Sequence, residues 1–275
     1  MPFHGFHTSV IGSSHIKNGT ECQDHSGFLQ LDNACAVVVC DGHGGEKHFR
    51  SAVGSGLAVG VALSVIGEFM SFMGNFKGNH EELLEQLERS IIQQWNAAVD
   101  AHYSDNTFSS DELAALTDKD QRAVLDNHAT AYGSTLIASI LYEGGCFGVQ
   151  LGDGECVLLT ENGDLVQPIA EDESIPFNLT TSLCDSEAFQ HFRKRKFWYD
   201  SPVAAVMVST DGVRNSFTSE EYFKGFCKSV FVSCRDNPDA AQAELEGFLP
   251  QLTAKGSGDD VSVAVGYILH AGDTE

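Results

Sequence analysis

The sequence predicts an α+β fold built on antiparallel strands, and two observations support this. First, short apolar runs between residues 133 and 167 follow one another closely, with the turn signals Glu143-Gly144-Gly145 and Glu161-Asn162-Gly163 between them. Strands joined in this way form an antiparallel meander. Second, long helical patterns interrupt and flank the strand regions instead of alternating with them one by one, which argues against repeated βαβ units.

In the first half of the chain, two strand regions precede three helices. Runs of small, β-branched and apolar residues indicate the strands, and apolar residues at helical spacing indicate the helices. The predicted strands are at 6–12 and 26–40, the latter split by a turn at Asp32-Asn33, and the predicted helices are at about 46–73, 81–102 and 113–126, the last capped within Ser110-Asp111-Glu112.

In the second half, strands dominate and two helices precede the last strand. The stretch 170–200 is polar and lacks a clear period, so an irregular loop is expected there. No repeat or linker divides the chain, and residues 1–275 are expected to form a single domain. The predicted strands are at about 133–142, 145–151, 154–160, 164–167, 203–210 and 261–269, and the helices are near 219–231 and 238–254.

Composition restricts the classes of partner. The chain has 16 Lys and Arg against 39 Asp and Glu, a formal net charge of −23. Such a charge repels nucleic acid and anionic membrane surfaces, so neither is an expected partner. The N-terminus lacks a signal peptide pattern and no membrane span is evident. The 8 cysteines include no Cys-x-x-Cys, which weakens zinc-ribbon and thioredoxin interpretations. A cytoplasmic monomer is expected.

Acidic residues recur where predicted strands begin or end. The segment Asp41-Gly42-His43-Gly44-Gly45 follows a buried apolar run, and a carboxylate there is costly unless a positive charge meets it. The glycines allow backbone carbonyls and ligands to approach closely, so a divalent metal ion is the simplest partner. Taken singly, each Asp-Gly pair is a common turn signal. Together they predict one carboxylate cluster, whose other members are Asp24, Asp153, Asp211 and the pair Asp259-Asp260.

The order of these motifs resembles the PPM/PP2C family of metal-dependent protein serine/threonine phosphatases, from about Gly12 to Tyr267. The resemblance implies a fold of two antiparallel β-sheets packed as a central sandwich flanked by helices, with the metal site at one end. The matching motifs are Gln23-Asp24, Asp41-Gly42-His43-Gly44-Gly45, Gly133-Ser134-Thr135-Leu136, Gly152-Asp153-Gly154, Thr210-Asp211-Gly212 and Asp259-Asp260.

The resemblance also implies a role for each acid. Two Mn²⁺ or Mg²⁺ ions, with a third and weaker one beside them, would activate water to hydrolyse phosphoserine or phosphothreonine in a protein substrate. No nucleophilic side chain is then required. In this scheme Asp41 bridges the two ions, the carbonyl of Gly42 binds one, Asp211 and Asp259 complete the pair, Asp24 holds a metal-bound water, and Asp153 helps the third ion together with Asp211.

His43 is the candidate general acid. It is the nearest residue able to protonate the leaving seryl or threonyl oxygen. The alternative is that His43 orients a ligand or a water molecule by hydrogen bonding. Both interpretations stay open.

The chain departs from the family pattern at the phosphate site and at the last motif. The family's Arg before the early acidic motif is missing, and Lys17, with His15 second, is the candidate replacement; Lys17 is otherwise a surface residue. A lysine offers a point charge and not a bidentate fork. Asp260 stands where the family usually has Asn, and this extra carboxylate either tightens metal binding or changes the surroundings of the ligands.

The substrate loop is a second departure. The segment at about 170–200 is short for the family and predicts a reduced or atypical flap. It contains the basic run His191 to Lys196, which either docks a phosphopeptide with acidic neighbours or forms a solvated turn. The adjacent Phe197-Trp198-Tyr199 is expected to anchor in the core.

Two other functions remain as alternatives. One is a catalytically silent regulatory or binding module that keeps the fold. Every predicted ligand position is acidic, which argues against it. The other is a phosphatase that acts on a small phosphoester, for which the metal chemistry would be identical.

Overall fold

In the computed structural model, which describes residues 3–73, 80–143, 145–169, 180–197 and 202–269, two five-stranded antiparallel sheets face each other. The first sheet has the order β1 (Phe3–Val10), β10 (Val261–Ile268), β9 (Val203–Ser209), β6 (Glu155–Thr160) and β7 (Leu165–Val166). The second has the order β2 (His25–Leu31), β3 (Ala34–Cys40), β4 (Leu136–Tyr142), β5 (Gly145–Leu151) and β8 (Arg193–Phe197).

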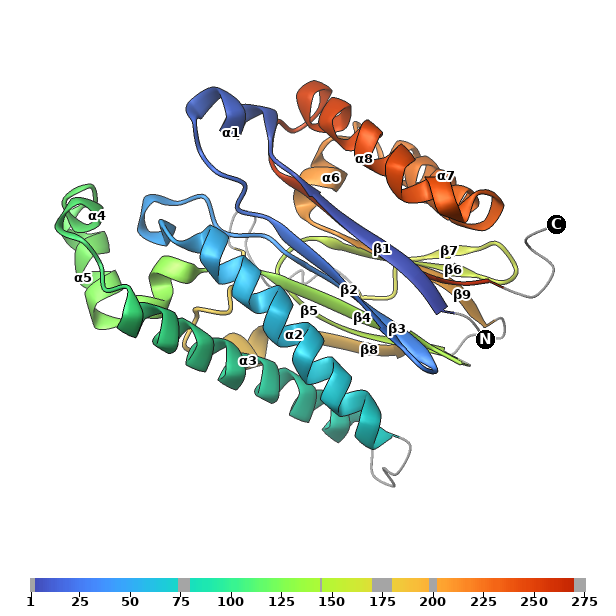
Figure 1. Ribbon diagram of the computed structural model, residues 1–275, viewed down its shortest axis with the longest axis horizontal. Helices are drawn as coiled ribbons and strands as arrows, with labels where there is room; N and C mark the ends of the chain where they lie inside the picture. The colour runs from blue at the N-terminus through green and yellow to red at the C-terminus, as the bar shows by residue number, and fades with distance from the viewer. Residues whose placement is uncertain (1–2, 74–79, 144, 170–179, 198–201, 270–275) are drawn as a thin grey trace.

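Helices cover both outer faces of this sandwich (Figure 1). The second sheet is covered by α2 (Ser51–Met73) and α3 (His80–Asp105), and the first by α7 (Glu220–Asp236) and α8 (Pro238–Lys255). Buried apolar clusters fill the space between the sheets and both helix–sheet interfaces. The layers therefore run helix, sheet, sheet, helix, and the predicted α+β sandwich is confirmed.

Strand β3 shows why its sequence is apolar without alternation. Its side chains point to opposite faces in turn. Val37 and Val39 belong to the cluster between the two sheets, while Ala36 and Val38 belong to the cluster under the helices. Because both faces are covered, every residue of β3 is buried. Because β3 is packed on both faces, the residue that follows it, Asp41, starts from a rigidly held strand end.

Helix α2 is unusually apolar. Its segment Ser51–Phe72 has a mean hydropathy of 1.7 and is the one helix, among those in the described residues, that is long and apolar enough to cross a membrane. The sequence analysis identified no such span. In the structure Ala58, Ala62 and Ile66 of α2 are buried in the cluster that α2 shares with the second sheet and α3. Packing on the sheet is thus one reason for the apolar composition.

The helix predicted at 113–126 is two helices. Helix α4 (Ser110–Ala114) begins after Ser109, which forms a capping box with Glu112. Helix α5 (Asp118–Asp126) begins after Thr117, whose side chain accepts a hydrogen bond from the Asp120 amide. A second N-cap inside the apolar pattern ends one helix and starts another.

Three regular elements were not predicted. Helices α1 (Ser13–Asn18) and α6 (Asp211–Asn215) are too short to show a period. Strand β8 lies within the region expected to be irregular, and it pairs with β5 at the edge of the second sheet. The 3₁₀ helices η1 (Glu46–His48), η2 (His128–Tyr132) and η3 (Ala188–His191) complete the described elements.

The predicted meander is divided between the sheets. Strand β4 pairs with β5, and β6 pairs with β7, but β5 and β6 belong to different sheets. The turn Gly152-Asp153-Gly154 therefore crosses from the second sheet to the first. This crossing places Asp153 at the end of the sandwich and not in a simple hairpin.

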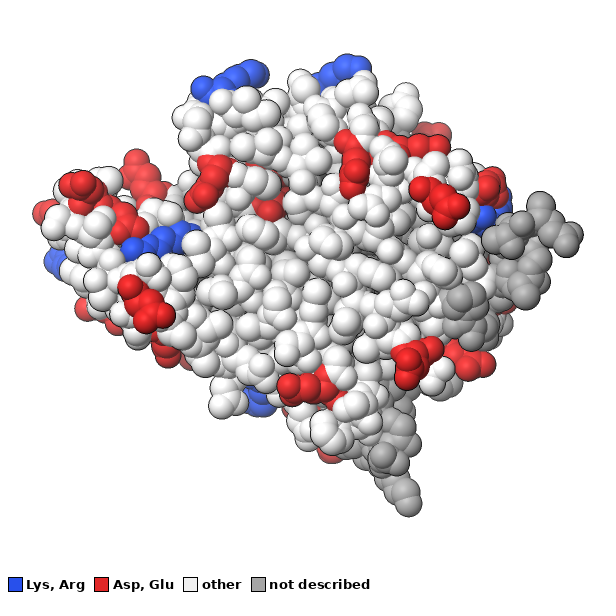
Figure 2. Space-filling model, in the orientation of Figure 1, with Lys and Arg blue, Asp and Glu red and all other residues white. Residues whose placement is uncertain are grey.

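Charged side chains are unevenly spread over the surface. On the face shown in Figure 2, Asp and Glu gather around the rim and the middle is almost free of charge. In the same orientation, that middle corresponds to α2, β1 and β2 (Figure 1). On this face, the acidic side chains that contribute to the net charge of −23 lie mainly toward the edge.

Candidate active site

Antiparallel pairing brings the acids of the second sheet together. His25 pairs with Cys40 at the end of the β2–β3 ladder, so Asp24 and Asp41 come opposite each other one residue further on. Strands β3 and β5 both pair antiparallel with β4, so they run in the same direction. Asp153, which follows β5, therefore lies at the same end of the sandwich as Asp41.

The first sheet contributes Asp211 and Asp259 at that end. Strand β9 ends at Ser209, and the Thr210 amide donates to the Ser262 carbonyl at 3.1 Å. Asp211 follows as the first residue of α6, and Asp259 precedes β10. The charges of Asp211 and Asp259 interact with each other and with Asp41. Asp41, Asp211 and Asp259, predicted from separate strand ends, thus share one electrostatic environment together with Asp24.

Burial and mutual repulsion raise the pKa values of three of these acids. Burial raises the pKa of Asp41 well above its usual range, and Asp24, Asp211 and Asp259 add to the shift. The pKa of Asp211 rises to about 6, first through burial and then through Asp153 and Asp259. The carboxyl groups of Asp41 and Asp211 also act on each other: Asp211 raises the pKa of Asp41, and Asp41 lowers that of Asp211.

Asp24 is buried, and its carboxylate accepts a hydrogen bond from the Thr210 hydroxyl at 2.7 Å. Burial raises the pKa of Asp24 well above its usual range, although the Thr210 hydrogen bond opposes the shift. The acids Asp260, Asp259 and Asp211 raise it further. A cation placed among these carboxylates would reverse these shifts, because an opposite charge favours the ionised form.

The donor atoms suit a divalent cation. Mn²⁺ and Mg²⁺ prefer carboxylate and carbonyl oxygens, and the cluster supplies such oxygens. Among the described residues, no three His, Cys, Asp or Glu side chains already surround one point as a complete ion site. The chemistry of the cluster therefore fits a metal. In this structure the acids contact nearby hydroxyl, backbone amide and imidazole groups.

The peptide after Asp41 is held on both sides. The Asp41 amide donates to the Thr135 hydroxyl at 2.9 Å, and the Thr135 amide donates to the Asp41 carbonyl at 2.8 Å. The Gly42 amide donates to the Gln23 carbonyl at 3.1 Å. A Cβ on Gly42 would lie 2.6 Å from that carbonyl oxygen, so glycine is required there. These contacts connect three of the sequence motifs in space.

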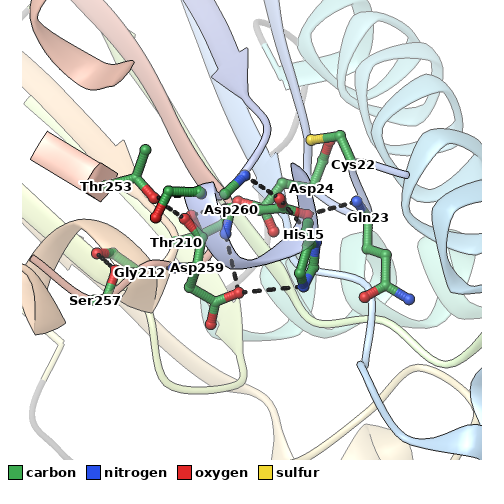
Figure 3. A network of polar contacts seen from close by, with 12 residues as sticks. His15, Cys22, Gln23, Asp24, Thr210, Gly212, Thr253, Ser257, Asp259 and Asp260 are labelled. Atoms are coloured by element: carbon green, nitrogen blue, oxygen red, sulfur yellow. Dashed lines mark hydrogen bonds and ion pairs between the residues drawn. The ribbon is translucent and has the colours of Figure 1, made fainter. Parts of the chain in front are cut away.

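Asp260 has partners that its prediction as a metal ligand did not anticipate. Its side chain is buried, and its two oxygens accept the amides of Gly12 at 2.5 Å and Gln23 at 2.6 Å (Figure 3). The adjacent Asp259 is 53% exposed. In this structure Asp260 ties the segments before α1 and β2 to the start of β10, while Asp259 is the member of the pair open to ligands.

The two candidates for the phosphate site differ in position. His15 lies between Asp259 and Asp260, with Nδ1 3.0 Å from Asp260 Oδ1 and Nε2 3.8 Å from Asp259 Oδ1 (Figure 3). Lys17 is exposed in the last turn of α1. His15 is thus the candidate that contacts the acidic cluster.

His43 lies beside a second histidine that the sequence analysis missed. The ring centroids of His43 and His48 are 4.9 Å apart, in an edge-on arrangement. Burial lowers the pKa of His43 to about 4, and His48 and Lys47 add to the shift. The sequence shows only that a second histidine follows His43 by five residues. That spacing does not predict that the two rings are in contact.

The turn that carries Asp153 is supported by the substrate-loop region. The Thr180 hydroxyl donates to Asp153 Oδ2 at 2.8 Å. The guanidinium of Arg193 donates to the Gly152 carbonyl, and the Gln150 amide group donates to the Gly154 carbonyl at 2.6 Å. The described part of the predicted flap therefore lies against the site.

The basic run is not simply a solvated turn. Lys194, on β8, lies 3.3 Å from Glu85 and 3.4 Å from Glu88, both on α3. Trp198 and Tyr199, predicted as a core anchor, are outside the described residues.

Comparison with known proteins identifies the family and the fold to which this arrangement of acids belongs. The protein phosphatase 2C family matches residues 11–250. A search of curated proteins found no match. Three solved structures with the same fold cover nearly all of the chain at low identity, which shows likeness of fold.

The first is a bacterial serine phosphatase, with a TM-score of 0.59 and 14% sequence identity; the match covers 98% of this chain and 99% of that chain. The second is the serine/threonine phosphatase Stp1 from Staphylococcus aureus, with a TM-score of 0.60 and 15% identity over 98% of this chain and 96% of that chain. The third is the Mycobacterium tuberculosis serine/threonine phosphatase PstP/Ppp, with a TM-score of 0.56 and 15% identity over 98% of this chain and 100% of that chain. With the family match over most of its length and this fold, the chain belongs to the protein phosphatase 2C family of serine/threonine phosphatases.

Proposed function

We propose that this protein is an active phosphatase that requires Mn²⁺ or Mg²⁺ and hydrolyses phosphoserine and phosphothreonine in proteins. The observation that carries the proposal is the convergence of Asp24, Asp41, Asp211 and Asp259 from both sheets, with their charges interacting. A silent module would have no need to maintain such a costly cluster. The described chain would act as one phosphatase domain.

Bound cations would supply Lewis-acid activation of water and neutralise the charge of the phosphoryl group. Asp41, Asp211, Asp259 and the Gly42 carbonyl would hold two ions, and Asp153 would contribute to a third. Asp24, fixed by the Thr210 hydroxyl at 2.7 Å, would accept a hydrogen bond from the attacking water.

His43 would supply a proton to the leaving group. The oxygen of water would form a bond to phosphorus as the bond between phosphorus and the seryl oxygen breaks, and the protonated His43 ring would give its proton to that oxygen. The proton released by the attacking water would then restore the ring. The low pKa of His43, about 4, makes its ring neutral at pH 7 in the free protein. A phosphate dianion beside the ring would raise this pKa and so favour the protonated ring that proton donation needs.

The two candidate phosphate-binding residues lie on α1. His15 contacts both Asp259 and Asp260, and Lys17 is exposed two residues further along. We propose that one of these two replaces the missing arginine. The substrate would be a phosphorylated protein. The weakly charged middle of the face shown in Figure 2 would repel an anionic partner less than the acidic edge of the same face.

Hydrolysis of p-nitrophenyl phosphate and of a phosphoserine peptide, with and without Mn²⁺, tests the proposal. We expect activity that needs added metal and is lost in EDTA. Asp211→Asn should lower kcat/KM by more than about a hundredfold, because it removes a ligand charge. Asp236→Asn is the matched control, since that carboxylate is exposed at the end of α7. Metal-independent rates, or an active Asp211→Asn variant, would contradict the assignment.

A further inference from the structure

His48 is buried and packed against His43. Its side chain is 9% exposed, and its ring meets the ring of His43 edge-on. Its Nδ1 donates to the Thr130 carbonyl at 2.5 Å. That hydrogen bond fixes both the orientation of the His48 ring and the nitrogen that carries the proton. The His48 ring, which borders His43 on one side, is therefore held in one orientation.

Gly133 lies against the rings of both His43 and His48. The His43 amide donates to the Gly133 carbonyl at 3.1 Å, which fixes the backbone of His43. A Cβ on Gly133 would lie 2.6 Å from His48 Nδ1 and 2.8 Å from His43 Cδ2. Both rings thus lie directly against this glycine, and neither has room to move toward it.

The segment that carries Thr130 is itself held in place by Arg50. The Arg50 amide donates to the Ala131 carbonyl at 2.9 Å, and the guanidinium donates to the Tyr132 hydroxyl at 2.8 Å. The guanidinium also forms an ion pair with Glu112 at 2.8 Å. The support for His48 therefore extends through η2 to α4, so it is part of a rigid assembly.

We propose that His48 is a positioning residue that holds the His43 ring in the orientation used in the reaction. The inference rests on the proposed function for its catalytic readout. It applies whether His43 donates a proton or orients a ligand, because either role needs a fixed ring. A displacement of about 1 Å in a reacting group can cost as much as a hundredfold in rate.

The test combines two single variants and their double variant. His48→Leu should lower kcat on a phosphoserine peptide about tenfold at saturating Mn²⁺, with KM nearly unchanged. His43→Ala should lower it further, and adding His48→Leu to His43→Ala should cause no additional loss. His48→Asn should recover most of the rate, because its amide nitrogen is as many bonds from Cα as Nδ1 and can donate to Thr130. His7→Leu is the matched control, since His7 is exposed on β1.

A structural measurement makes the test independent of catalysis. In a ¹³C-edited NMR spectrum of the metal-free protein, His48→Leu should shift or broaden the His43 ring signals, whereas His7→Leu should leave them in place. Additive losses in the double variant, or His43 signals indifferent to His48→Leu, would overturn the proposal. A wild-type protein without metal-dependent turnover would refute the proposed function alone, and the NMR comparison would still decide the role of His48.

Discussion

The Thr210 hydroxyl donates to the Asp24 carboxylate at 2.7 Å, which joins the end of β9 in one sheet to the start of β2 in the other. The same hydroxyl oxygen accepts the Ser262 amide at 2.9 Å. One buried side chain thus links both sheets at the acidic end of the sandwich. Thr210 is also the N-cap residue of α6, so this link holds the residue directly before the helix.

Replacing Thr210 tests this link. Thr210→Val keeps the shape but leaves Asp24 and the Ser262 amide without this partner, and we expect a loss of about 1–3 kcal/mol in the free energy of unfolding. Thr210→Ser retains the hydroxyl and should lose much less. Urea unfolding of the metal-free variants measures the difference. Equal stability of Thr210→Val and Thr210→Ser would show that the hydrogen bond contributes nothing.

The neighbours Asp259 and Asp260 should give opposite phenotypes. Asp260 is buried and accepts two backbone amides, so Asp260→Asn, which can accept only through one oxygen, should cost about 2 kcal/mol of stability or more. Asp259 is 53% exposed, so Asp259→Asn should leave stability nearly unchanged but weaken Mn²⁺ binding. Thermal unfolding and isothermal titration with Mn²⁺ separate the two effects. A strongly destabilised Asp259→Asn would contradict this division of roles.

Protons should compete with Mn²⁺ at the cluster. The pKa of Asp211 is raised to about 6, and that of Asp41 lies well above its usual range. Below pH 6 Asp211 holds a proton that a metal must displace, and the raised pKa of Asp41 acts in the same direction, so Mn²⁺ affinity should fall as pH decreases from 7 to 5. Calorimetric titrations in buffers of different ionisation enthalpy should also detect proton release on binding. A pH-independent affinity without proton release would contradict the direction of these shifts.

The strand ends that carry the acids were predicted from the sequence better than the contacts around them. Asp41 follows a strand whose continuous apolar run is unmistakable, and the Asp-Gly pairs mark the other strand ends. The register that makes the acids converge was not visible, because it depends on pairing between distant segments. Strand β8 was missed because its residues Arg193 to Lys196 are all basic, a composition typical of a protected edge strand and not of a core one.

Other site features were unpredictable for the same reason. Asp260 and Asp259 are adjacent and chemically identical, yet one binds backbone amides contributed by residues more than two hundred positions away. The position of His48 is fixed by Thr130, which is 82 residues distant. Local patterns identify residue types suited to a site, whereas the partners that assign each role come from the tertiary fold.

Glu88 should make the protein less stable as pH rises. It lies on α3, is 0% exposed, and its Oε1 has no hydrogen-bond partner within the described residues. Burial raises its pKa to about 7, although the charge of Lys194 opposes the shift. In the unfolded chain the pKa is near 4.5. Between these values the folded protein binds the extra proton, so the contribution to stability is present below pH 4.5 and is lost as pH rises through 7.

The difference between Glu88→Gln and wild type isolates this effect. A shift from 4.5 to about 7 corresponds to roughly 3 kcal/mol, so the free energy of unfolding of Glu88→Gln should rise by about that much relative to wild type between pH 5 and 8. Glu85→Gln is the matched control, because Glu85 also contacts Lys194 but is 43% exposed. Urea titrations at several pH values supply the comparison. Parallel pH profiles for wild type and Glu88→Gln would show that Glu88 ionises normally and that its burial carries no energetic cost.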